Sequence, residues 1–201
     1  MHQPEQAAKW IQYSKHTKHP LKEVYKNSKF ECKCCKTESR GMRYRCDQCN
    51  FDTHLTCGTC LISISSFTHP KHTLQLMEKP NLPFHKCNLC QNYIKGMVYR
   101  CKKCSFFVHP VCSQLPEYLV KHDKHPPHSL KLQLMLSSKC DVCEKSCKHW
   151  RYFCEICDVH IHVGCLSGKI PSDDDDEGGF GLLGEVLGGI LGGIAEGLLS
   201  S

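Results

Sequence analysis

The cysteines and histidines of this 201-residue chain carry side chains that bind metals and recur at regular intervals. A C-x2-C-x10-C-x2-C-x4-H-x2-C pattern occurs three times, with identical intervals in all three copies. The copies are Cys32, Cys35, Cys46, Cys49, His54 and Cys57; Cys87, Cys90, Cys101, Cys104, His109 and Cys112; and Cys140, Cys143, Cys154, Cys157, His162 and Cys165. A repeat whose shared content is thiols and imidazoles at fixed spacing indicates metal binding.

Zinc is the ion that such ligand sets favour. Two cysteines separated by two residues fit on one tight turn, so both sulfurs can lie about 2.3 Å from a shared ion. Each copy has too many ligands for one tetrahedral ion, so two sites must share them with help from a neighbouring histidine. Closed tetrahedral sites leave no position for a substrate, and no nucleophile–base set accompanies them. We therefore expect a protein that is not an enzyme.

Disulfide bonds are the alternative use of 18 cysteines, as in small secreted domains. Residues 1–29 are polar and lack the apolar run of a signal peptide. The histidines that are locked to the cysteine pattern also have no role in a disulfide framework. We therefore expect reduced cysteines and a location in the cytoplasm, the nucleus or both.

Short β-strands are predicted to position the ligands. Alternating apolar residues before the second and third copies, Leu74-Gln-Leu76 and Leu130-Lys-Leu132-Gln-Leu134, indicate a strand entering each unit. Gly41-Met-Arg-Tyr44 and Gly96-Met-Val-Tyr99 predict a turn and a strand between the cysteine pairs, whereas the third copy has His149-Trp-Arg-Tyr152 without the glycine. We expect the tyrosines to form a small core with Phe51, Phe106 and Val159. The lead segment with Trp10, Ile11 and Tyr13 is expected to pack on the first repeat or to fray.

The combined motif resembles a known family. The phrases H-P-x-H-x-L, C-x2-C and Y-x-C-x2-C-x-F-x-x-H-x2-C are similar to the plant cysteine/histidine-rich family. Its unit is a divergent form of the conserved-region-one zinc finger of protein kinase C, the diacylglycerol and phorbol-ester domain. The resemblance covers about residues 16–166. It implies a small metal-stabilised α+β fold of three tandem units, 16–66, 67–119 and 120–168, built from short antiparallel strands and a short helix.

The resemblance also implies a crossed pairing of two zinc sites in each unit. One site takes the first cysteine pair and the His-x2-Cys pair; we call it the Cys3His site. The other, the Cys2His2 site, takes an upstream histidine and the second cysteine pair. Its sets are His19, Cys46 and Cys49; His72, Cys101 and Cys104; and His128, Cys154 and Cys157.

The last ligand of each Cys2His2 site is not set by the motif. The histidine that opens the next phrase is the expected substitute, so His69 would complete the first unit and His122 or His125 the second. Nothing follows Cys165, so the third unit is one ligand short unless Cys147, His149 or His160 supplies it. The expected content is therefore five to six Zn2+ ions. Cys34, Cys60 and Cys147 are spare, although Cys60 could compete with His69.

The plant homeodomain-type finger is the alternative fold, since it shares the opening spacing and the crossed pairing. That fold needs a further C-x2-C after each His-x2-Cys. Cys87 and Cys90 could serve the first copy only at the expense of the second, and the third copy has no such pair. The sequence therefore favours the conserved-region-one type.

Charge and loop composition bear on partners. Seven of the 20 acidic residues follow Pro171, where no Lys or Arg occurs, so residues 1–171 carry 26 basic against 13 acidic groups. Such a surface could attract anionic lipid or nucleic acid, but the lysines are spread over all three units. In the parent domain, lipid enters a groove between two loops; the corresponding segments 36–45 and 91–100 are short and polar here. Diacylglycerol binding is therefore not carried over.

Residues 172–201 form a separate segment, with an acidic linker followed by a glycine-rich apolar tail. Apolar residues from Leu183 to Leu198 follow helical spacing, but nine glycines make the helix weak in water. Glu185 and Glu196 would each cost about 2.5–3.5 kcal/mol in a membrane span. We expect a tail that is disordered, or helical once it orders on a partner helix or a membrane surface.

Together these features predict a non-enzymatic zinc-binding adaptor of plant intracellular signalling or stress response, with a protein partner. The alternative is a zinc finger protein that associates with a membrane lipid or a nucleic acid through its basic surface, with peripheral membrane association.

Overall fold

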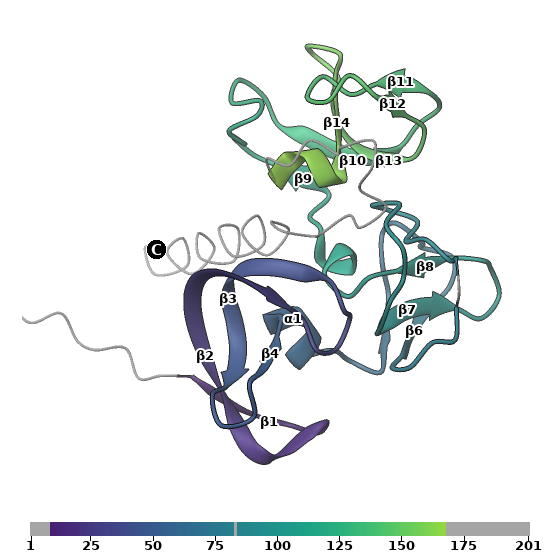
Figure 1. Ribbon diagram of the computed structural model, residues 1–201. Helices are drawn as coiled ribbons and strands as arrows, with labels where there is room; N and C mark the ends of the chain where they lie inside the picture. Colours follow the sequence, from purple (N-terminus) through teal and green to yellow (C-terminus); the bar gives the residue numbers. More distant parts are fainter. Residues whose placement is uncertain (1–8, 83, 168–201) are drawn as a thin grey trace, which may run out of the picture.

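Three small antiparallel sheets follow one another along the chain in the computed structural model, which describes residues 9–82 and 84–167 (Figure 1). The first has the order β1-β2-β3-β4, with β1 Trp10–Tyr13, β2 His16–Glu31, β3 Glu38–Cys46 and β4 Phe51–Thr53. The one-turn helix α1, Leu55–Gly58, follows it. The expected structure of the tail after residue 171 lies outside the described residues.

The second and third repeats have the same plan with shorter strands. The second sheet contains β5 Ser63–Ile64, β6 Leu74–Met77, β7 Val98–Cys101 and β8 Phe107–Val108, followed by a 3-10 turn at Cys112–Gln114. The third contains β9 Tyr118–Leu119, β10 Leu130–Leu134, β13 Trp150–Cys154 and β14 Val159–His162, followed by a 3-10 turn at Val163–Ser167. A separate hairpin pairs β11 Ser138–Lys139 with β12 Ser146–Cys147. The predicted fold class is confirmed.

The tyrosine two residues before the second cysteine pair anchors each sheet. Tyr44, Tyr99 and Tyr152 are all buried, as predicted. The Tyr99 hydroxyl donates to the Leu61 carbonyl at 2.9 Å, and the Tyr152 hydroxyl donates to the Pro116 carbonyl at 2.7 Å. Each of these bonds ties the sheet to the chain segment that enters its repeat, and each satisfies a polar group that would be costly to bury alone.

The lead segment packs on the first repeat. Strand β1 pairs with β2 in the register Trp10↔Lys22 and Ile11↔Leu21, and Tyr13 is buried. The first of the two expectations for this segment is therefore confirmed.

In the first and third repeats, a buried arginine donates hydrogen bonds to backbone carbonyls of a neighbouring segment. Arg43 donates to the carbonyls of Lys26 and Ser28 at 2.6 and 2.8 Å, and its guanidinium lies 4.2 Å from the centroid of the Phe30 ring. Arg151, at the matching position of the third repeat, donates to the carbonyls of Cys147 and Leu136. These bonds compensate the loss of water around a buried cation.

The second repeat has Val98 at that position. Val98 packs instead with Ile94 and Phe107, and Met77 and Leu82 lie against this cluster. The same place in the fold is therefore polar in two repeats and apolar in one.

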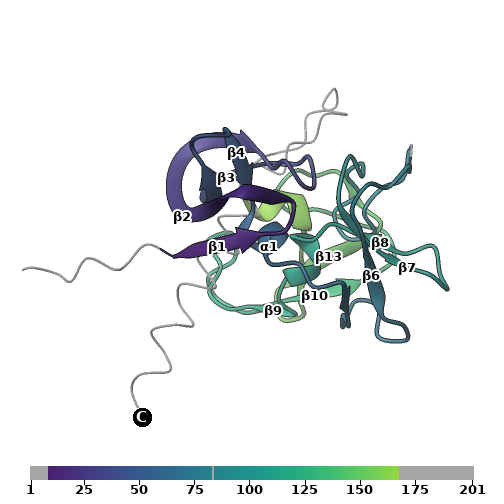
Figure 2. The same cartoon turned by 90° about the horizontal axis from the view of Figure 1, so that it is seen from below.

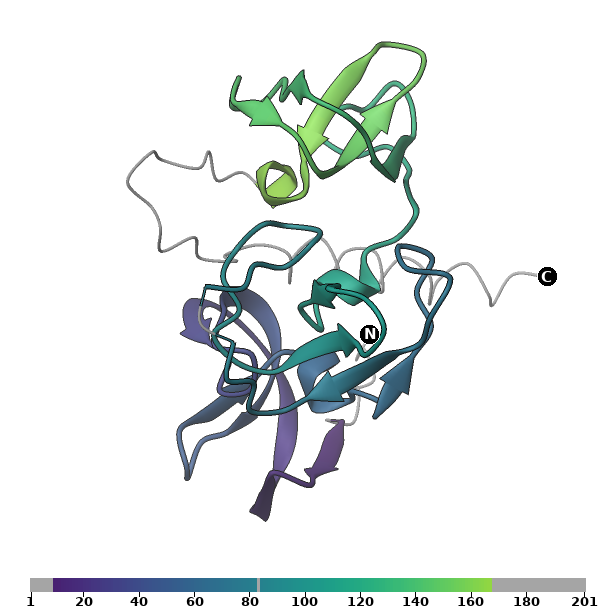
Figure 3. The same ribbon diagram turned by 90° about the vertical axis from the view of Figure 1, so that its right-hand side faces the viewer.

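The repeats pack against one another. The first and second lie side by side and the third lies beyond them (Figures 1 and 3), while Figure 2 shows β1–β4 and β6–β8 as separate groups of strands. The Met97 amide of the second repeat donates to the Cys34 carbonyl of the first at 2.9 Å, and Met97 is buried against Cys32, Cys35 and Cys57. A single hydrophobic core joins the second and third repeats; it includes Leu74, Tyr99, Leu115, Leu119, Leu130, Leu132, Tyr152 and Ile161. Within the part of the chain that the structure describes, no helix is long and apolar enough to cross a membrane.

Candidate metal centres

Each Cys3His site is built by a tight turn and the start of a helical turn. In the first cysteine pair of every repeat, the residue after the second cysteine has a left-handed backbone: Lys36, Gln91 and Glu144 have φ of 62°, 64° and 60°. Their amides donate to the carbonyls of Cys32, Cys87 and Cys140 at 2.8–2.9 Å. This closed turn points both sulfurs to the same side, where the His-x2-Cys pair arrives from the strand β4, β8 or β14.

The predicted Cys3His ligands come together. Cys32, Cys35, His54 and Cys57 have all their ligand atoms within 4.8 Å of one another, and so do Cys87, Cys90, His109 and Cys112. In the third repeat, the Nδ1 atom of His162 lies 3.3 Å from the Cys143 sulfur and 3.7 Å from the Cys165 sulfur. The His162 amide donates to the Cys140 sulfur at 3.4 Å, which places the fourth predicted ligand at the same centre.

The Cys2His2 sites differ from the prediction in one ligand each. The sets are His16, His19, Cys46 and Cys49; His69, His72, Cys101 and Cys104; and His125, His128, Cys154 and Cys157. The last ligand is thus the first histidine of the same H-x2-H phrase, not a histidine borrowed from the next repeat. The expectation that His69 completes the first repeat is wrong, because His69 faces His72 with 3.4 Å between their nitrogens Nε2 and Nδ1.

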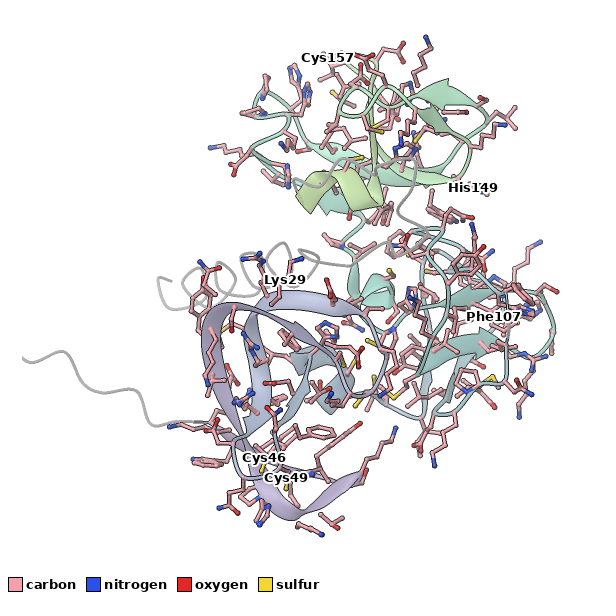
Figure 4. All side chains as sticks on the ribbon, viewed as in Figure 1. Lys29, Cys46, Cys49, Phe107, His149 and Cys157 are labelled. Atoms are coloured by element: carbon pink, nitrogen blue, oxygen red, sulfur yellow. The ribbon has the colours of Figure 1, made fainter. Side chains whose placement is uncertain are left out.

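The other expectations about the last ligand are also wrong. His122 is not part of the second set, and its Nδ1 accepts a hydrogen bond from the Lys124 amide at 3.2 Å. His125 belongs to the third repeat, so that repeat is not deficient and needs none of Cys147, His149 or His160 at this site. Figure 4 shows His149 on a different side of the repeat from Cys157.

The signal for the missed ligands was visible in the sequence. His16 and His19, His69 and His72, and His125 and His128 have the same two-residue gap as the cysteine pairs. The physical reason is local, since the entering segment of each repeat brings its two imidazoles to within 5.4–6.1 Å of each other, measured between ring centroids. A ligand from the next repeat would instead require a long loop to close.

The spacing of the ligand atoms fits zinc. Zinc–sulfur bonds of about 2.3 Å and zinc–nitrogen bonds of about 2.0–2.1 Å place a sulfur and a nitrogen of one tetrahedron about 3.6 Å apart. Two nitrogens of the same tetrahedron lie about 3.4 Å apart. The S···N distances in the six sites run from 3.2 to 3.9 Å, and the N···N distance between His69 and His72 is 3.4 Å. The Nε2 atoms of His16 and His125 are buried without a hydrogen-bond partner, as expected of nitrogens that coordinate an ion.

Neighbouring groups orient the ligands. The Nε2 atoms of His109 and His162 lie 3.3 and 3.1 Å from the carbonyls of Tyr93 and Ser146, which leaves Nδ1 to face the sulfurs. In the first repeat, the Thr37 hydroxyl lies 3.0 Å from the Cys35 sulfur. Such contacts fix the ring tautomer and stabilise the thiolate form of cysteine.

The local electrostatics favour an ionised thiol in each Cys3His site. Burial opposes ionisation of Cys32, but hydrogen bonds from Cys34, Cys35 and Cys57 and the charge of His54 hold its pKa well below the ordinary value. The same balance lowers the pKa of Cys87. In the third repeat, a hydrogen bond from Cys165 is the largest cause that lowers the pKa of Cys140. The thiolate is the form of cysteine that binds a metal.

Two of the spare cysteines have packing roles. The Cys34 sulfur lies 3.0 Å from the Tyr13 hydroxyl and accepts from the Thr53 hydroxyl at 3.3 Å. Cys60 donates to the Thr56 carbonyl at 3.1 Å and is not part of the first Cys2His2 set, so it does not compete for that site. The third, Cys147, is fully buried, and its carbonyl accepts a hydrogen bond from Arg151.

The two site types differ in exposure. All the cysteines of the Cys3His sites are buried or half-buried, whereas Cys49, Cys104 and Cys157 of the Cys2His2 sites are exposed. Figure 4 shows Cys46 and Cys49 at one end of the molecule and Cys157 at the other. The Cys2His2 sites therefore lie at the periphery, and the Cys3His sites lie closer to the packed interior.

Comparison with known proteins agrees with this arrangement. Human diacylglycerol kinase theta is 24% identical over 188 residues, which is 84% of this chain and 19% of that protein. Probable nucleoredoxin 1 of Arabidopsis thaliana is 34% identical over 58 residues, which is 29% of this chain and 10% of that protein. Probable nucleoredoxin 3 of Arabidopsis thaliana is 38% identical over 47 residues, which is 23% of this chain and 12% of that protein. The chain thus spans no more than a fifth of the length of these relatives. No solved structure matches the chain.

The family model of the C1 domain matches three segments, residues 14–58, 67–113 and 123–166. Each segment contains both metal sites of one repeat, so the predicted resemblance to the conserved-region-one finger is confirmed. With five to six Cys/His clusters that fit zinc, the chain is a zinc-binding protein that belongs to the C1 domain family and carries three C1 domains in tandem.

Proposed function

We propose that this chain is a non-enzymatic zinc-binding adaptor of intracellular signalling or stress response in a plant cytoplasm or nucleus, which presents rigid loops of its C1 domains to a protein partner. The closed ligand sets support the absence of catalysis, because four protein ligands leave a tetrahedral zinc no open coordination position. The resemblance to the plant cysteine/histidine-rich family and the two Arabidopsis thaliana relatives support the plant setting.

The buried arginines are the observation that carries the proposal. Arg43 donates to backbone carbonyls at the irregular part of β2, and Arg151 donates to the carbonyls of Leu136 and Cys147. A lipid that entered between these segments would have to displace a buried guanidinium together with its hydrogen bonds, which is costly. These segments are therefore held in place and suit contacts across their outer surface.

The third repeat offers an apolar contact at such a loop. Arg151 holds the Leu136 carbonyl from inside, while the Leu136 side chain is 91% exposed and Leu134 beside it is also exposed. A large apolar side chain on a preorganised loop is suited to a pocket of a protein partner, because little ordering entropy is lost on binding.

The test compares protein capture with membrane binding. Full-length chain on beads should capture a partner from cell extract about equally at low and high salt, and Leu136→Ser should reduce that capture. Ile156→Ser is the matched control, since Ile156 is also an exposed apolar residue of the third repeat. Loss of all capture at high salt, together with vesicle binding that Leu136→Ser reduces, would contradict the adaptor proposal.

The second C1 domain supports another candidate, association with a lipid surface. Val98 replaces the arginine there, the cluster of Ile94, Val98 and Phe107 is apolar, and nearby Phe84 is 89% exposed. One relative is by name a diacylglycerol kinase. This candidate predicts that phosphatidylcholine–phosphatidylserine vesicles with diacylglycerol pull down the chain more than vesicles without it. Phe84→Ser should abolish the difference, whereas Leu136→Ser should not.

A further inference from the structure

The three Cys2His2 sites differ in the charge of the residues between their ligands. We call the residues between the two histidines and between the two cysteines of such a site its tip. The tip of the second repeat contains Lys71, Lys102 and Lys103, and all three are exposed. The tip of the first repeat has one lysine and one aspartate, and that of the third has one glutamate and no lysine. Because two thiolates neutralise a zinc ion, only the second tip is strongly positive.

The metal ligands of the second repeat hold these lysines close together. Each lysine is the immediate chain neighbour of a ligand, and consecutive Cα atoms are about 3.8 Å apart. The Nδ1 atom of His72 lies 3.3 Å from the Cys104 sulfur, so the histidine pair and the cysteine pair meet there. The Lys103 amide also donates to the Cys101 sulfur at 3.3 Å. The site thus keeps together three like charges that repel one another.

The second repeat has almost no acidic side chains to balance this tip. Residues 59–116 contain seven lysines and arginines but one acid, Glu78, which pairs with Lys15 of the first repeat at 3.0 Å. Residues 117–167, in contrast, contain seven basic and six acidic residues. Among the residues that the structure describes, none of the three tip lysines forms an ion pair.

The composition of the tip narrows the kind of anion that suits it. Thr73 and Ser105, which flank the ligand pairs in the chain, are polar and exposed. Phe106 is buried and stacked on His69, with 4.5 Å between the ring centroids. The tip therefore offers charge without an exposed aromatic ring for a base to stack on, and without a large apolar side chain to enter a bilayer. A run of carboxylates requires neither.

The chain carries such a run itself. Asp173–Glu177 are five consecutive acidic residues, and no lysine or arginine follows them. The 3-10 turn Val163–Ser167 lies on the side of the third repeat that faces the other two (Figures 1 and 3). Leu166 in this turn belongs to the same hydrophobic core as Cys101, a ligand at the second tip. Ten extended residues beyond the turn reach about 35 Å, whereas a unit of about 50 residues is about 25 Å across.

We propose that the acidic segment Asp173–Glu177 binds to the lysine tip of the second repeat in the same chain. Each surface ion pair contributes little alone, but the tether gives the segment an effective concentration on the order of millimolar. The bound segment covers the most positive of the three tips and keeps it from other polyanions. Because the contact is electrostatic, salt releases it.

Cross-linking of the full chain tests this contact. A carbodiimide couples carboxylates to the lysine amines that touch them. At low salt, peptide mapping of the monomer should find residues 173–177 joined to Lys71, Lys102 or Lys103. These cross-links should disappear at about 1 M salt, where the Debye length is about 3 Å. Cross-links spread evenly over the lysines of all three repeats, or found only between two chains, would overturn the proposal.

Matched charge substitutions identify the lysines that take part. Lys102→Gln/Lys103→Gln should abolish most of the cross-links and leave the zinc content unchanged, since neither residue is a ligand. Lys33→Gln/Lys36→Gln is the control, because it removes the same charge from exposed positions of the first repeat. Equal loss of cross-links in the two variants would show attraction to the overall charge only, which contradicts a specific contact.

A change in the tail gives a second readout that does not depend on cross-linking. The full chain with Asp173–Asp176 all replaced by Asn should shift the amide resonances of Lys102 and Lys103. The resonances of Lys18 and Ile156, on the tips of the other two repeats, should stay in place. Unchanged resonances of Lys102 and Lys103 would overturn the proposal. If RNA or phosphatidylserine vesicles shift them instead, the tip binds a polyanion from outside the chain.

Discussion

At the scale of single residues, one position explains most of the difference between the repeats. The residue before the anchoring tyrosine is Arg43, Val98 or Arg151. The arginines replace apolar packing by hydrogen bonds to backbone carbonyls, so removing one takes the side-chain donor away from those carbonyls.

We expect Arg43→Leu to destabilise the first repeat by about 2–3 kcal/mol, because the carbonyls of Lys26 and Ser28 lose their donor and Phe30 loses its cation. Arg100→Leu is the control, since Arg100 is exposed on the second repeat. Thermal unfolding followed by hydrogen exchange of each repeat measures the effect. Equal effects of the two substitutions would contradict the role given to Arg43.

Exposure of the ligands predicts the order of zinc loss. Acid protonates thiolates and imidazoles and so competes with the metal. Because Cys49, Cys104 and Cys157 are exposed, we expect the Cys2His2 ions to leave at higher pH than the Cys3His ions. A chromophoric chelator in an acid titration should record two phases of similar size; a single cooperative release would show that exposure does not decide the order.

The residue scale was the most predictable from sequence. Fixed spacing identified the cysteine and histidine ligands, and the resemblance to the conserved-region-one finger implied which of them form the Cys3His sets. The last Cys2His2 ligand was missed because it depends on the backbone of the entering segment, and the spacing of His16 and His19 does not by itself specify that both rings face the second cysteine pair.

At the scale of elements, similar sequences have different roles. Gly41 and Gly96 both precede a methionine and both were predicted to form a turn. Gly41 lies within β3 and not in a turn, and its φ of 83° is one that a residue with a side chain rarely adopts. Gly96 instead lies against the first cysteine pair, where a Cβ atom would meet the Cys34 oxygen at 2.6 Å and the Cys35 carbonyl carbon at 2.7 Å. Strands β6 and β10 were predictable from apolar alternation, whereas this contact between repeats has no local signal.

We expect Gly96→Ala to separate the second repeat from the first zinc site, because backbone atoms of a closed turn cannot move away from the added methyl group. The Met97–Cys34 hydrogen bond should be lost, and exchange of the Met97 amide should rise at least tenfold. Gly164→Ala is the control, since a Cβ atom at that position meets nothing within 4 Å. If exchange of the Met97 amide were unchanged in Gly96→Ala, the prediction would be contradicted. The contact between the two repeats would then accommodate the added methyl group.

At the scale of the whole molecule, the three repeats are not equivalent in their packing. The second and third share one hydrophobic core, whereas the first meets the second mainly through its zinc-site turn and Met97. The third repeat is not set apart by a missing ligand, as the sequence had suggested, because His125 completes its Cys2His2 site.

The shared core predicts coupled unfolding. Removing a ligand of the third repeat by Cys154→Ser should raise amide exchange in β6 and β7 of the second repeat, because Leu74 and Tyr99 belong to the same core as Tyr152 and Ile161. Exchange in β3 of the first repeat should change much less. Similar increases in all three repeats, or an increase confined to the third, would contradict this coupling.

In each repeat, the two histidines of the Cys2His2 site precede the cysteines of the same repeat. This order has a consequence for the gain and loss of repeats. The ligands of the two sites fall within 16–57, 69–112 and 125–165, and these spans do not overlap. A gene segment that encodes one span carries every donor that its two ions need. Duplication or loss of a whole span would therefore leave every metal site of the neighbouring repeats complete. The number of repeats can change without a compensating change of ligands in another repeat.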